Sequence, residues 1–238
     1  MGSEIQISII AISDIKLKET IKALEISSKS LNPTETLLFT SKSINLSNDN
    51  YNLIKIIKID PISSIKEYSN FVIYNLYKYI KTSHILIVQW DGFICNKKKW
   101  DKNFLKYDYI GAPFIPRESD HQYSRDKNDS FYIIGNGGFS LRSKRLLEAP
   151  SKYNLKDNKD FTNNHEDGFF SVNHRKFLES KGYIWAPFFL AEKFSIESPL
   201  SYKQIKDLPF GFHGRRMFYI LKTKNLLKKL FIFLKTIF

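Results

Sequence analysis

An apolar run that ends abruptly in a carboxylate and a glycine constrains this chain more than any other feature. The run is His84-Ile-Leu-Ile-Val-Gln-Trp-Asp91-Gly92. Its continuous aliphatic stretch is typical of a strand buried on both faces of a parallel sheet. In open α/β sheets, ligands bind at the carboxyl ends of such strands, so Asp91 is expected at a ligand-binding edge, where Gly92 allows a sharp turn. The alternative is that Asp91 only caps that turn.

Strand-like and helix-like segments alternate through the first half of the chain. The predicted strands are residues 5–12, 36–40, 53–59 and 84–88, and the predicted helices follow the first and third of them. Such alternation is typical of a mostly parallel sheet with right-handed crossovers. We therefore expect an α/β fold with a single, mostly parallel Rossmann-like sheet and helices on both faces.

Polar residues mark where these helices are expected to begin and end. Ser13 or Asp14 can cap the first helix, whose apolar stripe ends before Asn32-Pro33. Ser64 and Glu67 have the spacing of a capping box, which predicts the start of the second helix. Local signals thus support both helices that the periodicity predicts.

Length and composition fit one folded domain. The chain has 238 residues, of which 42% are hydrophobic and 15% aromatic, too many for a disordered chain. Cys95 is the only cysteine, which excludes an intramolecular disulfide and fits a reducing compartment. The first residues show no secretory signal, so a cytoplasmic protein is expected.

The net charge of +13 is distributed unevenly. Residues 215–238 hold seven Lys and Arg side chains and no acidic one, at the spacing of an amphipathic helix that lies on an anionic membrane surface. The alternative is a terminal helix packed on the domain. We predict a globular domain over residues 1–214 and a basic amphipathic tail over residues 215–238. Because the basic residues gather in the tail, no nucleic-acid partner is expected.

Three clusters in the second half could carry chemistry. The glycines of Gly135-Asn-Gly-Gly138 would allow positive φ and let backbone N–H groups point at a ligand. The alternative is that this segment is only a tight turn. Glu166-Asp167 opens a predicted helix to about residue 180, where acidic side chains suit the helix dipole or supply a general base. His213, between glycines, could complete with Asp91 the coordination of Mn²⁺ or Mg²⁺, although a lone histidine is usually structural.

Taken in order, several segments resemble a known family. They are Gln89–Phe93, Tyr107–Pro113, Gly135–Arg142, Glu166-Asp167 and Phe210–Gly214. In this combination they are similar to a bacterial family that is catalogued as a domain of unknown function and regarded as glycosyltransferase-like, with the glycosyltransferase A fold. The resemblance covers residues 85–214, and the earlier residues match only in their strand and helix alternation.

The resemblance implies roles for individual residues. In glycosyltransferase A enzymes an Asp-x-Asp motif at the end of a central strand holds Mn²⁺ against the nucleotide diphosphate, and that role falls to Asp91. Gln89 stands where the motif has its first Asp, which implies weaker metal binding. A late histidine completes the metal site in related families, which matches His213. The acidic pair resembles the base region of inverting members, so Asp167 is the first choice of base and Glu166 the second.

The predicted function is transfer of a sugar from a nucleotide-sugar donor to a glycan or lipid-linked acceptor, with UDP favoured on family analogy alone. The predicted nucleotide- and donor-binding residues are Ile12, Ser13, Gln89, Asp91, Gly92, Asn136, Gly137 and Gly138. Asp167 would take the acceptor proton while the metal stabilises the leaving diphosphate, with inversion at the anomeric carbon. Residues 1–91 would form the nucleotide-binding half and residues 92–214 the acceptor and catalytic half, with 117–130 as a flap.

Two other function classes stay open. A binding module that keeps the fold without catalysis would bind nucleotide sugars without turnover. A metal-dependent hydrolase or nuclease that uses Asp91, Glu166, Asp167 and His213 would release products without a sugar acceptor. For a transferase that builds a lipid-linked glycan, we expect a peripheral position on the inner face of the cell membrane.

Overall fold

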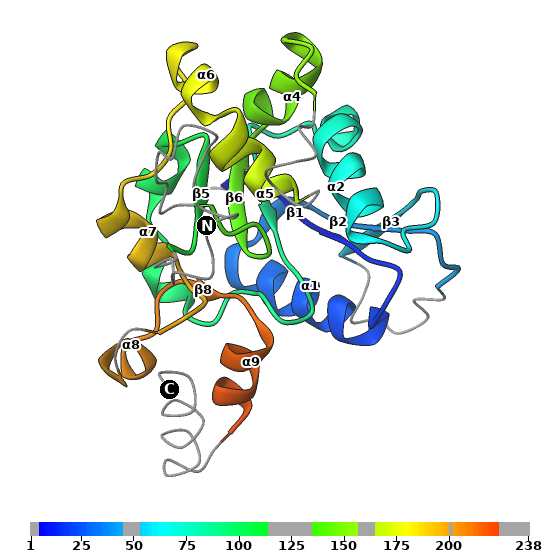
Figure 1. The fold of residues 1–238 in the computed structure, drawn as a ribbon. Helices are drawn as coiled ribbons and strands as arrows, with labels where there is room; N and C mark the ends of the chain where they lie inside the picture. Colours follow the sequence, from blue (N-terminus) through cyan, green and yellow to red (C-terminus); the bar gives the residue numbers. More distant parts are fainter. Residues whose placement is uncertain (1–4, 45–52, 114–134, 157–164, 200–201, 224–238) are drawn as a thin grey trace.

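A six-stranded sheet forms the centre of the computed structural model, which describes residues 5–44, 53–113, 135–156, 165–199 and 202–223 (Figure 1). The strands are β1 (Ile5–Ile12), β2 (Pro33–Thr40), β3 (Ile54–Lys58), β4 (His84–Ile87), β5 (Tyr109–Gly111) and β6 (Ser140–Ser143). They lie in the order β3-β2-β1-β4-β6-β5. Strands β1 to β4 pair in parallel, and β6 is antiparallel to both β4 and β5. The predicted mostly parallel sheet is therefore confirmed.

The strand order reverses between β1 and β4. From β1 the chain adds β2 and β3 on one side, and then returns to add β4 on the other side. Ile10 lies opposite Ile87, and the Val88 N–H donates to the Ile10 carbonyl at 2.8 Å, so both strands end at one edge. In open α/β sheets the crevice outside the carboxyl ends of the strands at such a reversal is the usual ligand site. The segments that follow β1 and β4 flank this place.

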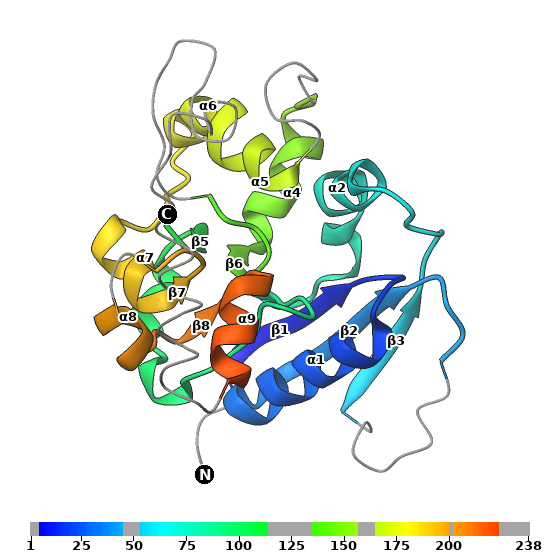
Figure 2. The same cartoon turned by 60° about the horizontal axis from the view of Figure 1, so that its bottom comes forward.

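Helices cover both faces of the sheet, as predicted. Figure 2 shows α1 on one face and α2, α4 and α5 on the other. The helices of the described residues are α1 (Leu17–Leu31), α2 (Ile65–Tyr74), α4 (Lys144–Lys152), α5 (Glu166–Gly168), α6 (Arg175–Ser180), α7 (Phe188–Phe194), α8 (Tyr202–Lys206) and α9 (Arg215–Lys222). Shorter turns are η2 (Leu76–Tyr79), η3 (Lys97–Lys99), η4 (Lys102–Lys106) and the π-helical η6 (Phe169–Asn173).

The start of α1 differs from the prediction, while the start of α2 agrees with it. Ser64 Oγ accepts a hydrogen bond from the Glu67 N–H at 3.2 Å and so caps α2. The residue that precedes α1 is instead Lys16, whose backbone is left-handed with φ 46° and whose side chain forms no cap. Asp14 accepts hydrogen bonds at 2.6 to 2.8 Å from Thr40, Ser41 and Ile62. It ties the end of β1 to β2 and to the chain beyond β3.

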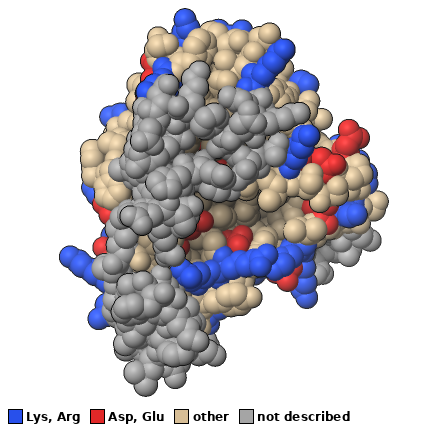
Figure 3. Space-filling view, viewed as in Figure 1, with Lys and Arg blue, Asp and Glu red and all other residues tan. Residues whose placement is uncertain are grey.

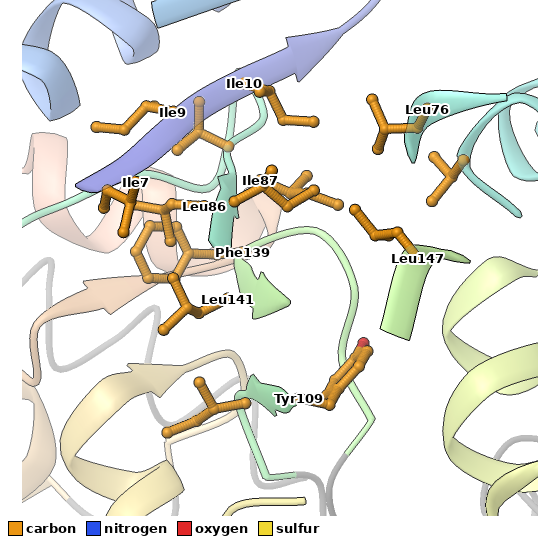
Figure 4. Close-up of a cluster of buried hydrophobic side chains, with 14 of the residues drawn as sticks. Ile7, Ile9, Ile10, Leu76, Leu86, Ile87, Tyr109, Phe139, Leu141 and Leu147 are labelled. Atoms are coloured by element: carbon orange, nitrogen blue, oxygen red, sulfur yellow. The ribbon is translucent and has the colours of Figure 1, made fainter. Parts of the chain in front are cut away.

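The hydrophobic core is centred on β1 and β4. Ile7, Ile9 and Ile10 of β1 and Leu86 and Ile87 of β4 have no exposed surface. Figure 4 shows these side chains packed with Leu76, Tyr109, Phe139, Leu141 and Leu147 from the surrounding elements. Because these two strands carry the reversal point, the segments that leave them start from a rigid base.

A second, smaller cluster involves the end of the described chain. The two-residue strands β7 (Ser195–Ile196) and β8 (Gly211–Phe212) pair in parallel, and α9 packs beside them through Met217, Phe218 and Ile220. Residues 215–222 of the predicted tail are thus packed on the domain, while residues 224–238 lie outside the described residues. Within the described ranges, no helix combines the length and apolar character needed to cross a bilayer.

Candidate functional site

Asp91 lies on a tight turn directly after β4. Gln89 and Gly92 exchange two backbone hydrogen bonds of 2.8 and 3.0 Å across this turn. Asp91 is 7% exposed, and its carboxylate accepts no hydrogen bond from another residue in the described part of the chain. Burial raises its pKa, against the charges of His213, Arg215 and Lys16. Its own backbone also bonds the carboxylate and works against this rise in pKa. A buried carboxylate whose hydrogen bonding is confined to its own turn is unusual in a folded protein, so Asp91 is suited to bind a ligand as well as to cap that turn.

His213 lies between two other side chains of the site. Its Nδ1 is 3.1 Å from Glu197 Oε1, and its Nε2 is 3.1 Å from Gln89 Oε1. Burial by itself lowers the pKa of His213, but Glu197, together with the charges of Asp91 and Asp167, raises it overall. The imidazole is therefore held from both sides, with three carboxylates near it.

The glycines of this region make room for the histidine ring. A Cβ on Gly138 would lie 2.0 Å from His213 Nε2, and one on Gly92 would lie 2.8 Å from His213 Cδ2. Gly137 has a comparable constraint, since its Cβ would lie 2.4 Å from Glu166 Oε1. Neither Gly137 nor Gly138 has positive φ. The expectation of a left-handed backbone here was wrong, because close packing is what requires these glycines.

Asn136 presents an amide oxygen without a partner. Its Nδ2 donates to Glu197 Oε2 at 2.8 Å and lies 3.2 Å from His213 Nδ1. The opposite atom, Oδ1, is buried and accepts no hydrogen bond from the described residues. Buried polar atoms are nearly always paired, so this oxygen is suited to accept a hydrogen bond from a ligand hydroxyl.

Glu166 and Asp167 are adjacent in sequence but have different surroundings. Glu166 Oε1 lies 2.8 Å from Arg142 Nη2 in an ion pair whose side chains are 6% and 0% exposed. Asp167 is half-buried and accepts hydrogen bonds from the N–H groups of Gly137 at 3.2 Å and Gly168 at 2.8 Å. Burial and the charge of Glu166 raise the pKa of Asp167 to about 7. Arg142 thus neutralises Glu166, and Asp167 is the carboxyl group left to exchange a proton.

The helical segment that positions this pair is close to the predicted one. The segment from Glu166 to Ser180 consists of α5, the π-helical turn η6 and α6, and only His174, between η6 and α6, is not helical. π-Helical turns are frequent at functional sites. Phe169 and Phe170 on η6 are fully buried and anchor the preceding acidic pair against the core.

The metal-binding prediction can be tested against the side chains that the site provides. Among the described residues, no three His, Cys, Asp or Glu side chains gather in an arrangement that could hold a metal ion. Both ring nitrogens of His213 already have partners, and Gln89 occupies the position of the first motif carboxylate. The residues therefore do not fit a metal centre built by protein ligands alone, and Asp91 offers one carboxylate.

The remaining predicted residues lie near this edge but use their side chains locally. Ile12 is 6% exposed and belongs to the core, and among the described residues Ser13 Oγ bonds only the backbone of Ile15. The flap predicted at residues 117–130 lies outside the described residues. The structure does bring together Gln89, Asp91, Gly92, Asn136, Gly137, Gly138, Glu166, Asp167 and His213.

Sequence reasoning missed three contributors to the site. Glu197 orients both His213 and Asn136, and Tyr68 of α2 accepts a hydrogen bond from Gln89 Nε2 at 3.4 Å. Arg142 was noticed only as the end of a motif. A signal for it was available, because an arginine inside the otherwise apolar segment Phe139-Ser-Leu-Arg142 needs a buried partner.

Comparisons with known proteins place this site in a family. A solved structure described as a glycosyltransferase involved in the glycosylation of the major capsid of PBCV-1 has 14% identity and a TM-score of 0.47, over 95% of this chain and 98% of that one. A197 from STIV has 13% identity and a TM-score of 0.37, over 70% of this chain and 76% of that one. No curated protein matches. The family model described as "Protein of unknown function (DUF5672)" matches residues 52–213, from the strand before α2 to His213, and the chain belongs to that family.

Proposed function

We propose that this protein is a glycosyltransferase that moves a sugar from a nucleotide-sugar donor to a hydroxyl of a glycan or lipid-linked acceptor. Residues from four of the segments that resemble a glycosyltransferase-like family, Gln89, Asn136, Asp167 and His213, lie together beyond the end of β4, and the carboxyl ends of α/β strands are where such sheets bind nucleotides. Asn136 Oδ1 is buried there without a partner among the described residues, and the charges of Asp91 and Asp167 both act on His213. This arrangement supports binding of a polar ligand next to a proton acceptor.

The state of Asp167 is the observation that carries the proposal. A general base works best when its pKa is near the working pH, and burial raises the pKa of Asp167 to about 7. Arg142 forms its ion pair with Glu166, and its charge offsets only part of the rise in the pKa of Asp167. In the proposed reaction Asp167 takes the proton of the acceptor hydroxyl as that oxygen attacks the anomeric carbon. The bond from this carbon to the diphosphate breaks, and configuration inverts.

The donor and the metal ion are finer parts of the proposal. UDP is the favoured nucleotide by family analogy. Mn²⁺ or Mg²⁺ would need phosphate oxygens and waters beside Asp91, a ligand set that Mg²⁺ commonly accepts. Such an ion, when bound, would neutralise charge on the leaving diphosphate.

A thermal-shift screen followed by turnover measurements tests the proposal. Purified protein is heated with UDP, GDP, CMP and their sugars, each with Mn²⁺ and with EDTA, and a raised melting temperature identifies the nucleotide. Turnover of the corresponding sugar is then measured with acceptor glycans for the parent and for Asp167→Asn. Transfer by the parent and its loss in the variant are expected. Binding without any transfer would favour a binding module, and free sugar or phosphate release without an acceptor would favour a hydrolase.

The hydrolase alternative has little support from the geometry. It would use Asp91, Glu166, Asp167 and His213 together with metal, but Glu166 is held by Arg142 and His213 by Glu197 and Gln89. Within the described residues these four groups do not form a metal site.

We also propose that residues 224–238 bind an anionic membrane surface, which would bring the site to a lipid-linked acceptor. Truncation must begin after α9, because Met217 and Ile220 are fully buried. Deletion of residues 224–238 should abolish sedimentation with phosphatidylglycerol vesicles and leave the melting temperature unchanged. Retained sedimentation would remove this part of the proposal.

A further inference from the structure

Two cations meet the same aromatic ring beside Asp91. Lys16 Nζ lies 3.5 Å from the centre of the Trp90 ring, and Arg215 Cζ lies 5.7 Å from it. Lys16 follows β1, Trp90 follows β4 and Arg215 begins α9, so three separate parts of the chain contribute. Trp90 also packs edge-on against Phe218 of α9, with ring centroids 5.5 Å apart. The aromatic contacts thus fix both cations at the place where the strand order reverses.

Neither cation is used in an ion pair within the described ranges. Lys16 and Arg215 are exposed, and both are close enough to Asp91 for their charges to oppose the rise in its pKa. Figure 3 shows a band of Lys and Arg side chains across this face, over the region of α1, with acidic side chains next to it. Lys and Arg stacked on an aromatic ring remain able to bind an anion with their N–H groups.

We infer that Lys16, Trp90 and Arg215 form a diphosphate-binding subsite that needs no metal ion. The inference rests on the proposed function, which supplies a nucleoside diphosphate as leaving group. Two charges on separate elements suit a ligand with two adjacent phosphates better than one with a single carboxylate. They also supply positive charge that could neutralise the leaving diphosphate. The other described residues of the site do not form a metal centre that could supply it.

The start of α1 adds to this subsite. Lys16 adopts a left-handed backbone conformation with φ 46°, and no side chain caps the helix. The first N–H groups of α1 therefore have no side-chain cap among the described residues, and the helix dipole there favours an anion, against the charge of Glu19 in the same turn. Lys16 would contribute through its charge and through the helix that it begins.

Binding measurements on the full chain in EDTA test this inference. Calorimetry is performed with UDP, inorganic pyrophosphate and uridine for the parent, Lys16→Gln and Arg215→Gln. Lys18→Gln and Arg216→Gln are matched controls, since each removes the same charge from an exposed residue of the same helix. We expect UDP and pyrophosphate to bind the parent in EDTA, and each of the two subsite variants to weaken both by roughly 10-fold or more. Uridine binding and the control variants should be unchanged.

The outcomes separate this inference from the proposed function. If UDP binds only when Mn²⁺ is present, or if the subsite and control variants behave alike, the subsite is wrong even when sugar transfer is observed. If UDP and pyrophosphate bind in EDTA and depend on Lys16 and Arg215, the subsite stands even when no nucleotide sugar is turned over. Raised salt should weaken pyrophosphate binding to the parent, as expected for an exposed charged site.

Discussion

The two ends of β4 and β6 both hold buried charged side chains, but their aspartates differ in whether other side chains donate hydrogen bonds to them. At the amino end of β4, Asp108 accepts hydrogen bonds from Ser143 Oγ at 2.5 Å, Arg145 Nε at 2.6 Å and the Ile184 N–H at 2.8 Å. At the carboxyl end, Asp91 and Asp167 accept none from another side chain of the described residues. The first arrangement stabilises the fold, and the second is available for a ligand.

The amino end also shows that a hollow does not by itself indicate a functional site. A cavity of about 420 Å³ lies there, lined by residues that include His84, Asp108 and Arg145. Burial lowers the pKa of His84, and both of its ring nitrogens have partners, Ser83 Oγ at 3.1 Å and the Tyr107 carbonyl at 3.2 Å. The difference between the two ends therefore lies in how their polar groups are paired, and not in burial or in the presence of charge.

The largest expected effect is on turnover in Asp167→Asn. Asparagine keeps the size of the side chain but cannot accept the acceptor proton, so turnover should fall by at least about 100-fold. The pKa of about 7 also predicts that the parent's turnover rises with pH, with a midpoint near 7, as Asp167 loses its proton. Initial rates from pH 5 to 9 measure both effects.

Stability should change in the opposite direction in this variant. Because the pKa of Asp167 is raised on folding, its charged form destabilises the folded state as pH rises from the unfolded value of 3.8 toward 7. At pH 8 Asp167→Asn should therefore melt at a higher temperature than the parent. A lower melting temperature together with normal turnover would place Asp167 among the structural residues.

Glu166→Gln tests a paired residue inside the site. Removal of this charge leaves Arg142 buried without a counter-ion, at a cost of about 3 kcal/mol in the free energy of unfolding. The charge of Glu166 also raises the pKa of Asp167, so the pH midpoint of turnover should move to lower pH. Urea unfolding and the pH profile measure the two effects. An unchanged midpoint would mean that Asp167 is not the group that titrates.

Asp108→Asn tests the paired end of the sheet. The variant keeps one acceptor oxygen but loses the charge that holds Arg145, so we expect a loss of about 2 kcal/mol in the free energy of unfolding. Turnover per folded molecule should be unchanged. Asp207→Asn is the control, because its ion pair with Lys99 is exposed and contributes little. If Asp108→Asn lowered turnover without lowering stability, the proposed distinction between the two ends would be wrong.

Much of the fold could be predicted because local patterns determine it. Short stretches of sequence are enough to indicate the aliphatic runs of β1 and β4, the Ser64 cap and the alternation of strands and helices. The start of α1 could not be predicted this way. Asp14 has the identity of a capping residue, but Ser41 and Ile62, far away in sequence, provide stronger partners for its carboxylate.

The site was predictable in its residue types but not in its pairing. Asp91, Asp167 and His213 were identified from their motifs, whereas the sequence gives no means of deciding which acidic neighbour pairs with Arg142. That choice depends on how β6 packs against α5, which places the guanidinium 2.8 Å from Glu166. Glu197 was missed for a similar reason, since it lies 16 residues before His213 and reaches it only through the pairing of β7 with β8.

Asp14 is a carboxylate at the edge of the proposed site whose hydrogen bonds are nevertheless satisfied within the protein. Its substitution should have the smallest effect of those considered. It follows β1 at the carboxyl end, which is the same edge as the proposed site. Its carboxylate nevertheless accepts four hydrogen bonds and is as well paired as that of Asp108. Burial raises its pKa, but the bonds from Ile62, Ser41 and Thr40 outweigh that and lower it to about 2. We expect Asp14→Asn to lose about 1 kcal/mol at pH 7, after discounting for the partial exposure of the group, and to keep its turnover.

The pH dependence of that loss identifies its cause. A lowered pKa stabilises the folded state fully above the unfolded value of 3.8, and this contribution disappears as pH falls toward 2. The difference between parent and Asp14→Asn in urea unfolding should therefore shrink between pH 5 and pH 2. Asp60→Asn removes the same charge from an exposed residue after β3 and should show no such convergence. If Asp14→Asn instead lost turnover at unchanged stability, the proposed distinction would be wrong. A carboxylate would then act on the substrate because it lies at the carboxyl edge of the sheet, whether or not it is hydrogen-bonded within the protein.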